Sequence, residues 1–268
     1  MNINTVTLAY YSPTKTTRNI LQGIAAGLNA DRVQDMDLTL PEAKTTPVDG
    51  EQVDLVILGV PVYEGRVAKT AIPRLRRLAA DKTPAVVVVL YGNRDYEDAL
   101  LELGDLAEDL GFIPIAGGAF IGEHSFATKT RPMANGRPDE QDLAHAREFG
   151  AGIRAKLEKM GSLDDAVRID LPGNTPYIFR DRSPLADRAA TTIAETCTLC
   201  GTCASLCPVG AITIEDTVLT DNLACTLCCA CVKDCPTASR VVDDPAVNKI
   251  ADWVSRHFQD RREPETFI

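Results

Sequence analysis

Cysteine is absent from the first 196 residues of this 268-residue chain. Uncharged apolar runs are short, and none approaches the roughly 18 residues that a transmembrane helix needs. Positive charge is also scarce, because 28 Lys and Arg residues stand against 38 Asp and Glu residues, for a net charge of −10. Such a surface repels phosphate backbones, so we expect no nucleic-acid partner and favour basic docking partners. The N-terminal segment lacks the features of a secretion signal, so we expect a cytoplasmic location.

Several familiar enzyme motifs are missing as well. The chain has no G-x-x-x-x-G-K-[ST] loop, no G-x-G-x-x-G after a predicted strand, and no G-x-S-x-G. These absences argue against a P-loop nucleotidase, a Rossmann NAD site and a serine hydrolase.

The first 160 residues alternate between short apolar runs and amphipathic helical patterns. The predicted strands are 6–11, 33–38, 54–62, 84–91 and 112–121. The predicted helices are 16–29, 68–80, 96–110 and 138–160. Near-continuous apolar runs at 54–62 and 84–91 are typical of parallel strands that helices cover on both faces. The order predicts an α/β fold with a doubly wound, five-stranded parallel sheet.

The composition changes after residue 160. Residues 161–190 contain several prolines and glycines and are predicted to be a linker. All nine cysteines then lie between 197 and 235, where the pattern C-x2-C-x2-C-x3-C-P occurs twice, beginning at Cys197 and at Cys225. A dense group of thiols in a cytosolic chain indicates metal binding rather than disulfides. Residues 245–260 have the pattern of an amphipathic helix.

This cysteine run is the signature of bacterial proteins with two [4Fe-4S] clusters, in which the fourth cysteine of each copy binds the other cluster. The predicted ligands of the first cluster are Cys197, Cys200, Cys203 and Cys235. The predicted ligands of the second cluster are Cys225, Cys228, Cys231 and Cys207. Zinc is the alternative, but zinc sites favour two separated C-x2-C pairs. Cys229 is left over and is interpreted as a small buried residue.

The loop after the first predicted strand is rich in hydroxyl groups. Ser12, Thr14, Thr16 and Thr17 surround Lys15 just before a predicted helix. Free N–H groups and the helix dipole make such a place suitable for a phosphate, although ordinary helix capping is the simpler alternative. Tyrosines in the loops after the third and fourth strands are candidates to stack on a planar ring, or to pack at the base of their loops.

The sequence resembles a known combination of families. Residues 1–160 resemble flavodoxins through S-P-T-K-T-T and the two tyrosine loops, and residues 191–236 resemble two-cluster bacterial ferredoxins. The tandem resembles the flavodoxin–ferredoxin fusion proteins of anaerobes. The resemblance implies a strand order of 2-1-3-4-5, followed by a small α+β ferredoxin-like domain at 191–240 and a C-terminal helix and tail at 241–268.

The resemblance also implies a bound FMN. Its phosphate would be held by Ser12, Thr14, Lys15, Thr16 and Thr17. Its ring would lie beside Tyr63 and Gly65 on one side and beside Asn93 and Tyr96 on the other.

The function expected from this combination is electron transfer between FMN, two [4Fe-4S] clusters and an external low-potential redox protein. Two alternatives remain open at this stage: an FMN-dependent reductase of a small substrate, and a redox sensor whose flavin has been lost. His124 is either a group near the flavin or a loop cap, and Arg74, Arg76 and Arg77 are expected on a solvated helix face.

Overall fold

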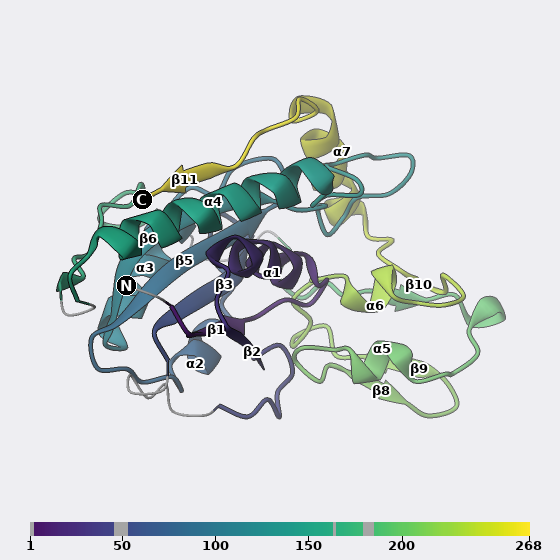
Figure 1. Ribbon diagram of the computed structural model, residues 1–268. Coiled ribbons are helices and arrows are strands. Elements are labelled where there is room, and N and C mark those ends of the chain that lie inside the picture. The colour runs from purple at the N-terminus through teal and green to yellow at the C-terminus, as the bar shows by residue number, and fades with distance from the viewer. Residues whose placement is uncertain (1–2, 46–52, 163–164, 179–184) are drawn as a thin grey trace.

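The computed structural model describes residues 3–45, 53–162, 165–178 and 185–268 (Figure 1). Parts of the predicted linker, including Phe179 and Pro184, lie outside the described residues. Within the described residues, no helix has the length and apolar character needed to cross a membrane.

Five parallel strands form the main sheet, as the sequence predicts. They are β1 (Thr5–Tyr10), β2 (Arg32–Asp37), β3 (Leu55–Tyr63), β5 (Thr83–Tyr91) and β6 (Phe112–Ile121). Their order across the sheet is β2-β1-β3-β5-β6, which is the flavodoxin-like order 2-1-3-4-5 when only these strands are counted. The expected fold is therefore confirmed. Two short strands that were not predicted extend it: β4 (Arg66–Val67) pairs with β3, and β11 (Glu265–Phe267) pairs antiparallel with β6.

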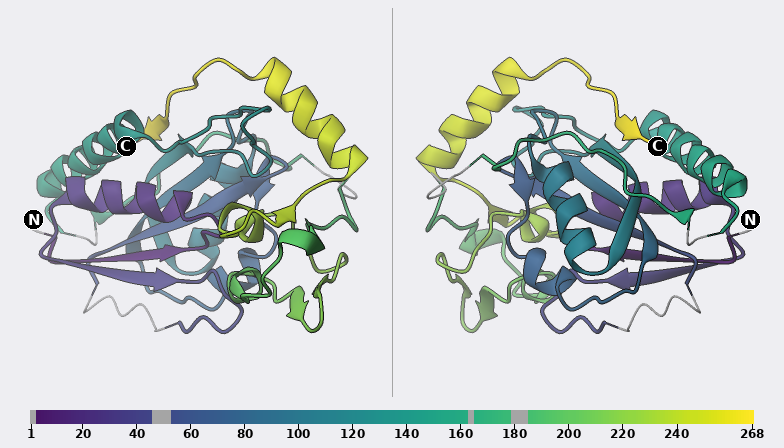
Figure 2. Two further views of the ribbon diagram at one scale, coloured as in Figure 1. Left: turned by 90° about the vertical axis from the view of Figure 1, so that its right-hand side faces the viewer. Right: turned by 90° about the vertical axis from the view of Figure 1, so that its left-hand side faces the viewer.

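Helices cover both faces of this sheet (Figures 1 and 2). On one face, α1 (Thr16–Leu28) and α4 (Glu140–Lys159) pack together over an apolar core. Two glycines allow their close approach: a Cβ at Gly27 would lie 2.0 Å from the Arg147 carbonyl oxygen, and one at Gly150 would lie 2.0 Å from the Ile24 carbonyl oxygen. The other face is covered by α3 (Ala99–Asp109) and the short α2 (Ile72–Leu75).

The predicted helix at 68–80 is wrong in its extent. Only four residues, Ile72–Leu75, form α2. Pro73 lies in its first turn, where a proline is tolerated because it has no N–H to donate to a preceding turn, so the helix does not extend toward residue 68. Beyond Leu75 the chain continues in tight turns, in which the N–H of Leu78 donates to the Leu75 carbonyl.

Residues 190–242 form a second, smaller unit with its own apolar core, which we call the cysteine-rich module. It contains two antiparallel strand pairs, β7 (Thr191–Thr192) with β10 (Arg240–Val241) and β8 (Ile212–Ile214) with β9 (Val218–Thr220). It also contains two one-turn helices, α5 (Thr202–Ser205) and α6 (Ala230–Lys233), one from each copy of the repeat. The β8–β9 pair lies between the two copies of the repeat.

The C-terminal segment returns from the cysteine-rich module to the main sheet (Figure 2). Asp244 caps the first turn of helix α7 (Pro245–His257), which packs with the loop that contains Phe126 and Met133. The chain then crosses to β6, where β11 adds a strand to the edge of the sheet. The tail therefore connects the two units of the molecule.

Candidate iron–sulfur and cofactor site

Cysteines from both copies of the repeat line one small cavity in the cysteine-rich module, four of them predicted ligands and the fifth Cys229. Cys225, Cys228 and Cys231 come from the second copy, and Cys207 ends the first copy. Apolar residues such as Ile212 complete much of the wall. These four thiols are the set that the repeat predicts for the second cluster.

The other four predicted ligands lie nearer the surface of the same module. Cys203 is buried, Cys197 and Cys235 are partly exposed, and Cys200 is exposed. Hydrogen bonds from Thr202 lower the pKa of Cys200, and the charge of Cys235 opposes this effect. Cys235, from the second copy, is therefore within electrostatic reach of a first-copy cysteine.

The fourth cysteine of each copy receives a backbone hydrogen bond at its sulfur. The Ala211 N–H donates to Cys207 Sγ at 3.2 Å, and the Ser239 N–H donates to Cys235 Sγ at 3.2 Å. In both copies the donor lies four residues after the cysteine, beyond the proline. Hydrogen bonds of this kind stabilise a thiolate and tune the potential of a cluster bound to it.

The arrangement of the sulfurs favours a cluster over a single ion. One zinc ion requires its thiolates about 2.3 Å from the metal, so the sulfurs must converge on a point. Among the residues that the structure describes, no three Cys, His, Asp or Glu side chains come close enough together to hold one ion. Thiols that surround a cavity without converging on a point fit a four-iron cluster, which is larger and binds one thiolate at each iron.

Cys229, the ninth cysteine, takes the position that Gly201 has in the first copy. Both residues have positive φ angles, 62° and 81°, and each directly precedes a one-turn helix. Cys229 is 3% exposed, and burial raises its pKa well above the ordinary value. Its thiol donates to the Leu227 carbonyl at 3.4 Å. Although Cys229 lies in the cavity wall, it has the properties of a neutral packing residue.

The five residues predicted to bind phosphate lie in the loop after β1 and in the first turn of α1, a helix of 13 residues. Lys15, at the position before the helix, has a φ of 66° and provides no side-chain cap. The Oγ1 atom of Thr17 is buried and has no hydrogen-bond partner among the described residues. The Arg18 N–H of the first turn already donates to Ser12 Oγ at 3.2 Å. A phosphate oxygen would satisfy the Thr17 hydroxyl and the N–H groups that remain at the start of the helix, so the loop fits that group.

The two loops predicted to enclose a flavin ring meet each other directly. Gly65, with a φ of 78°, lies so close to Glu97 that a Cβ there would be 2.1 Å from its carboxylate. The Gly65 carbonyl also accepts a hydrogen bond from the Asp98 N–H at 3.1 Å. Gly65 therefore fixes the contact between the loops.

Asn93 and Tyr96 hold the C-terminal tail. Asn93 is 3% exposed, and its Nδ2 donates to the carbonyl oxygens of Phe258 at 2.8 Å and Asp260 at 2.9 Å. The Tyr96 hydroxyl donates to Glu265 at 2.9 Å. Because these polar groups already have partners, the geometry gives no support for their predicted contacts with a flavin ring. The sequence gives no signal for partners that lie more than 160 positions away.

Tyr63, which ends β3, and Tyr11, which follows β1, lie near Cys228 of the second set. Burial raises the pKa of Tyr63 well above the ordinary value, and the nearby Cys228 adds to this effect. Tyr11 is fully buried, and the Arg74 guanidinium lies 5.3 Å from the centre of its ring. Arg74 also donates to the carbonyl of Pro208, next to a predicted ligand. The boundary of the two units is thus aromatic and close to the thiols.

Arg74 is only partly exposed at this boundary, so the prediction that its side chain lies on a solvated helix face is wrong. Arg76 and Arg77 are exposed, as predicted.

Two ion pairs join the two units at the same boundary, through the two residues before Cys235. Lys15 pairs with Asp234 at 2.7 Å, and Lys233 pairs with Glu123.

His124 acts as a loop cap. Its Nδ1 accepts a hydrogen bond from the Phe126 N–H at 3.1 Å, and its ring packs directly over Gly92. Burial lowers the pKa of His124 to about 4, and the charges of Lys233 and Arg94 add to this effect. The imidazole is therefore neutral near pH 7, which matches the loop-capping interpretation.

The comparisons with known proteins match the two units of the chain separately. The profile of the 4Fe-4S binding domain family matches residues 190–213, which include the first copy of the cysteine repeat. The cysteine-rich module contains a 4Fe-4S binding domain. The second copy of the repeat, beyond the matched residues, has the same cysteine spacing. No curated protein sequence matches the chain.

Solved structures resemble the first unit at low identity. A flavodoxin from the domain Archaea is 14% identical, with a TM-score of 0.40 over 57% of this chain and 99% of that chain. Flavodoxin 2 from Bacillus cereus is 16% identical, with a TM-score of 0.41 over 57% and 99%. A WrbA-like flavodoxin from Agrobacterium tumefaciens is 17% identical, with a TM-score of 0.38 over 59% and 98%. The flavodoxin-like assignment therefore relies on strand order and connectivity.

Proposed function

We propose that this protein transfers electrons between a bound FMN and two [4Fe-4S] clusters, and exchanges them with an external low-potential redox protein. The observation that carries the proposal is the cavity lined by Cys207, Cys225, Cys228 and Cys231, which lies beside Tyr63 at the boundary with the flavodoxin-like sheet. When bound, FMN supplies both one-electron and two-electron chemistry, whereas each cluster supplies one-electron transfer.

The residues of this chain have separate tasks in the proposal. Eight cysteines hold the clusters, and the N–H groups of Ala211 and Ser239 stabilise the thiolates of the fourth cysteine in each copy. The loop that contains Thr17 holds the FMN phosphate. The second set of cysteines faces the flavodoxin-like unit, whereas Cys200 of the first set is exposed to solvent. We therefore assign internal electron exchange to the second set and exchange with the external protein to the first set.

Reduction of the anaerobically prepared protein tests this function. Dithionite is expected to bleach the visible absorbance of both the clusters and a stoichiometric flavin, and EPR is expected to detect two magnetically interacting [4Fe-4S] centres. A preparation that contains the clusters but binds no FMN would contradict the flavin part of the proposal. A preparation without two coupled clusters would contradict the whole proposal.

Thr17→Val provides a matched variant for the phosphate loop. Because Thr17 Oγ1 has no partner among the described residues, the valine is expected to leave the stability of the protein unchanged. A lost hydrogen bond to a charged phosphate corresponds to about 1.5–3 kcal/mol. FMN binding should therefore weaken by about tenfold to a hundredfold, as measured by flavin fluorescence titration of the apoprotein. Unchanged affinity would exclude this hydroxyl from the phosphate site.

A further inference from the structure

Arg240 breaks the symmetry of the cysteine repeat. It lies in β10, five residues after Cys235, and is 2% exposed. The corresponding residue of the first copy is Ile212, five residues after Cys207, which is an apolar core residue at 8% exposure. The second copy therefore places a cation where the first copy has an aliphatic side chain.

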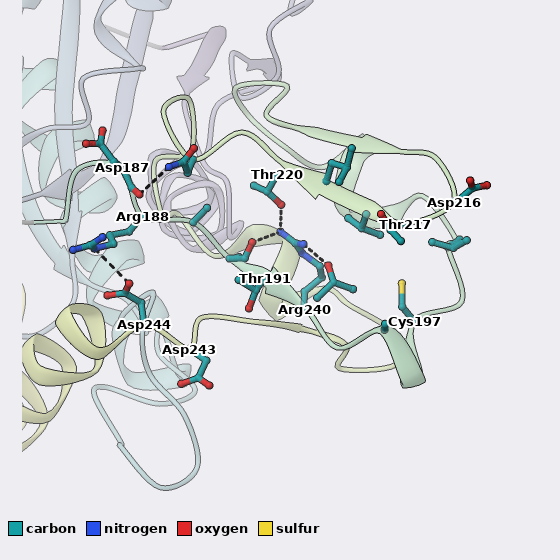
Figure 3. A pocket seen from close by; sticks show the side chains of 18 residues that line it. Asp187, Arg188, Thr191, Cys197, Asp216, Thr217, Thr220, Arg240, Asp243 and Asp244 are labelled. Atoms are coloured by element: carbon teal, nitrogen blue, oxygen red, sulfur yellow. Dashed lines mark hydrogen bonds and ion pairs between the residues drawn. The ribbon is translucent and has the colours of Figure 1, made fainter.

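The guanidinium of Arg240 has hydrogen bonds but no carboxylate partner among the described residues. It donates to Thr192 Oγ1 at 2.6 Å, to the Ala190 carbonyl at 2.9 Å and to Thr220 Oγ1 at 2.9 Å. Its Nε atom has no partner within the described part of the chain. Figure 3 shows this side chain in the wall of a cavity of about 610 Å³, beside Thr220. A buried charge without a counter-charge is unfavourable, so its retention needs an explanation.

The nearest sulfurs supply that explanation. Arg240 Nη2 lies 3.8 Å from Cys231 Sγ, and Cys231 belongs to the second set of predicted ligands. Cys197, which belongs to the first set, lines the same cavity as Arg240. One buried cation thus contacts a cysteine of the second set and shares a cavity with a cysteine of the first set.

We propose that Arg240 is the shared counter-ion of the two clusters and raises their reduction potentials, most strongly for the cluster held by Cys231. This inference rests on the proposed binding of two clusters. A [4Fe-4S] core with four thiolates carries a net negative charge, and reduction adds one electron to it. A fixed positive charge in a buried site stabilises the more negative, reduced form.

Substitution of Arg240 with methionine and lysine tests the inference. In Arg240→Met, the reduction equilibrium of the second cluster should shift at least tenfold toward the oxidised form, which corresponds to about 59 mV for a one-electron couple. The first cluster should shift in the same direction by less. Arg240→Lys retains the charge and should keep most of the wild-type potential. The readout is an anaerobic redox titration followed by EPR, together with the iron content of each variant.

Arg188→Met is the matched control. Arg188 lines the same cavity but is paired with Asp244 at 3.4 Å, so its removal should leave both potentials unchanged. If Arg240→Met keeps all its iron and its wild-type potentials, the inference is wrong although the proposed function stands. Equal loss of iron in the methionine and lysine variants would also overturn it, because that result would mean that the Arg240 side chain supports the fold and that its charge has no role. Loss of iron in Arg240→Met alone would support it. A wild-type protein without clusters would instead contradict the proposed function.

Discussion

Serine in place of Cys203 is expected to lower the iron content from about eight to about four per chain. Cys203 is the buried member of the first set, and a serine hydroxyl is a poor substitute for a thiolate ligand. The second set has its own cavity, lined by Cys225, Cys228 and Cys231 with Cys207, so the second cluster should remain. Iron analysis after anaerobic reconstitution measures the change, and EPR should detect one isolated centre without magnetic coupling.

Cys229→Ala is the control for this experiment. Cys229 adopts the conformation of Gly201, and its thiol already donates to the Leu227 carbonyl. We expect this variant to retain about eight irons per chain. A fall toward about four irons would mean that Cys229 is a ligand and that the assignment within the second set is wrong.

Asp142→Asn is expected to destabilise the flavodoxin-like unit by about 3 kcal/mol, because it breaks a buried ion pair and leaves one charge unpaired. Asp142 is fully buried and Arg137 is 6% exposed. Arg137 Nε donates to Asp142 at 2.9 Å, and the Asp139 N–H donates to the same carboxylate at 2.9 Å, within the capping box of α4. Arg137 also donates to the Arg262 carbonyl at 2.8 Å, so the same ion pair supports the C-terminal tail.

Urea unfolding of the cluster-loaded protein, followed by far-UV circular dichroism, measures this effect. Arg154→Gln serves as the comparison, since Arg154 forms an exposed pair with Glu158 on the same helix at 3.6 Å. That substitution should change stability by less than about 0.5 kcal/mol. Equal effects of the two substitutions would contradict the role assigned to the buried pair.

The main sheet was predictable because its strands carry their own signal. Runs such as the one within Thr83–Tyr91 are apolar throughout, and every residue of that strand is buried between two helical layers. The strand β11 had no such signal, because Glu265–Phe267 is short and mostly exposed and gains its structure only by pairing with β6.

The candidate site likewise has features that the sequence predicts and features that it does not. The two cysteine sets follow from the spacing of the repeat and stay a prediction, although the four members of the second set line one cavity together with Cys229. The tasks of Asn93 and Tyr96 were not predictable, since their partners are in the distant tail. The importance of Arg240 was equally hidden, because an arginine in a short strand carries no sign that it will be buried.

Metal and sulfide analysis of the anaerobically isolated wild-type chain is the most direct test of the central claim. We expect about eight iron atoms and about eight inorganic sulfides per chain, with no zinc. Zinc in a fixed ratio to the protein, with little iron and no acid-labile sulfide, would contradict it.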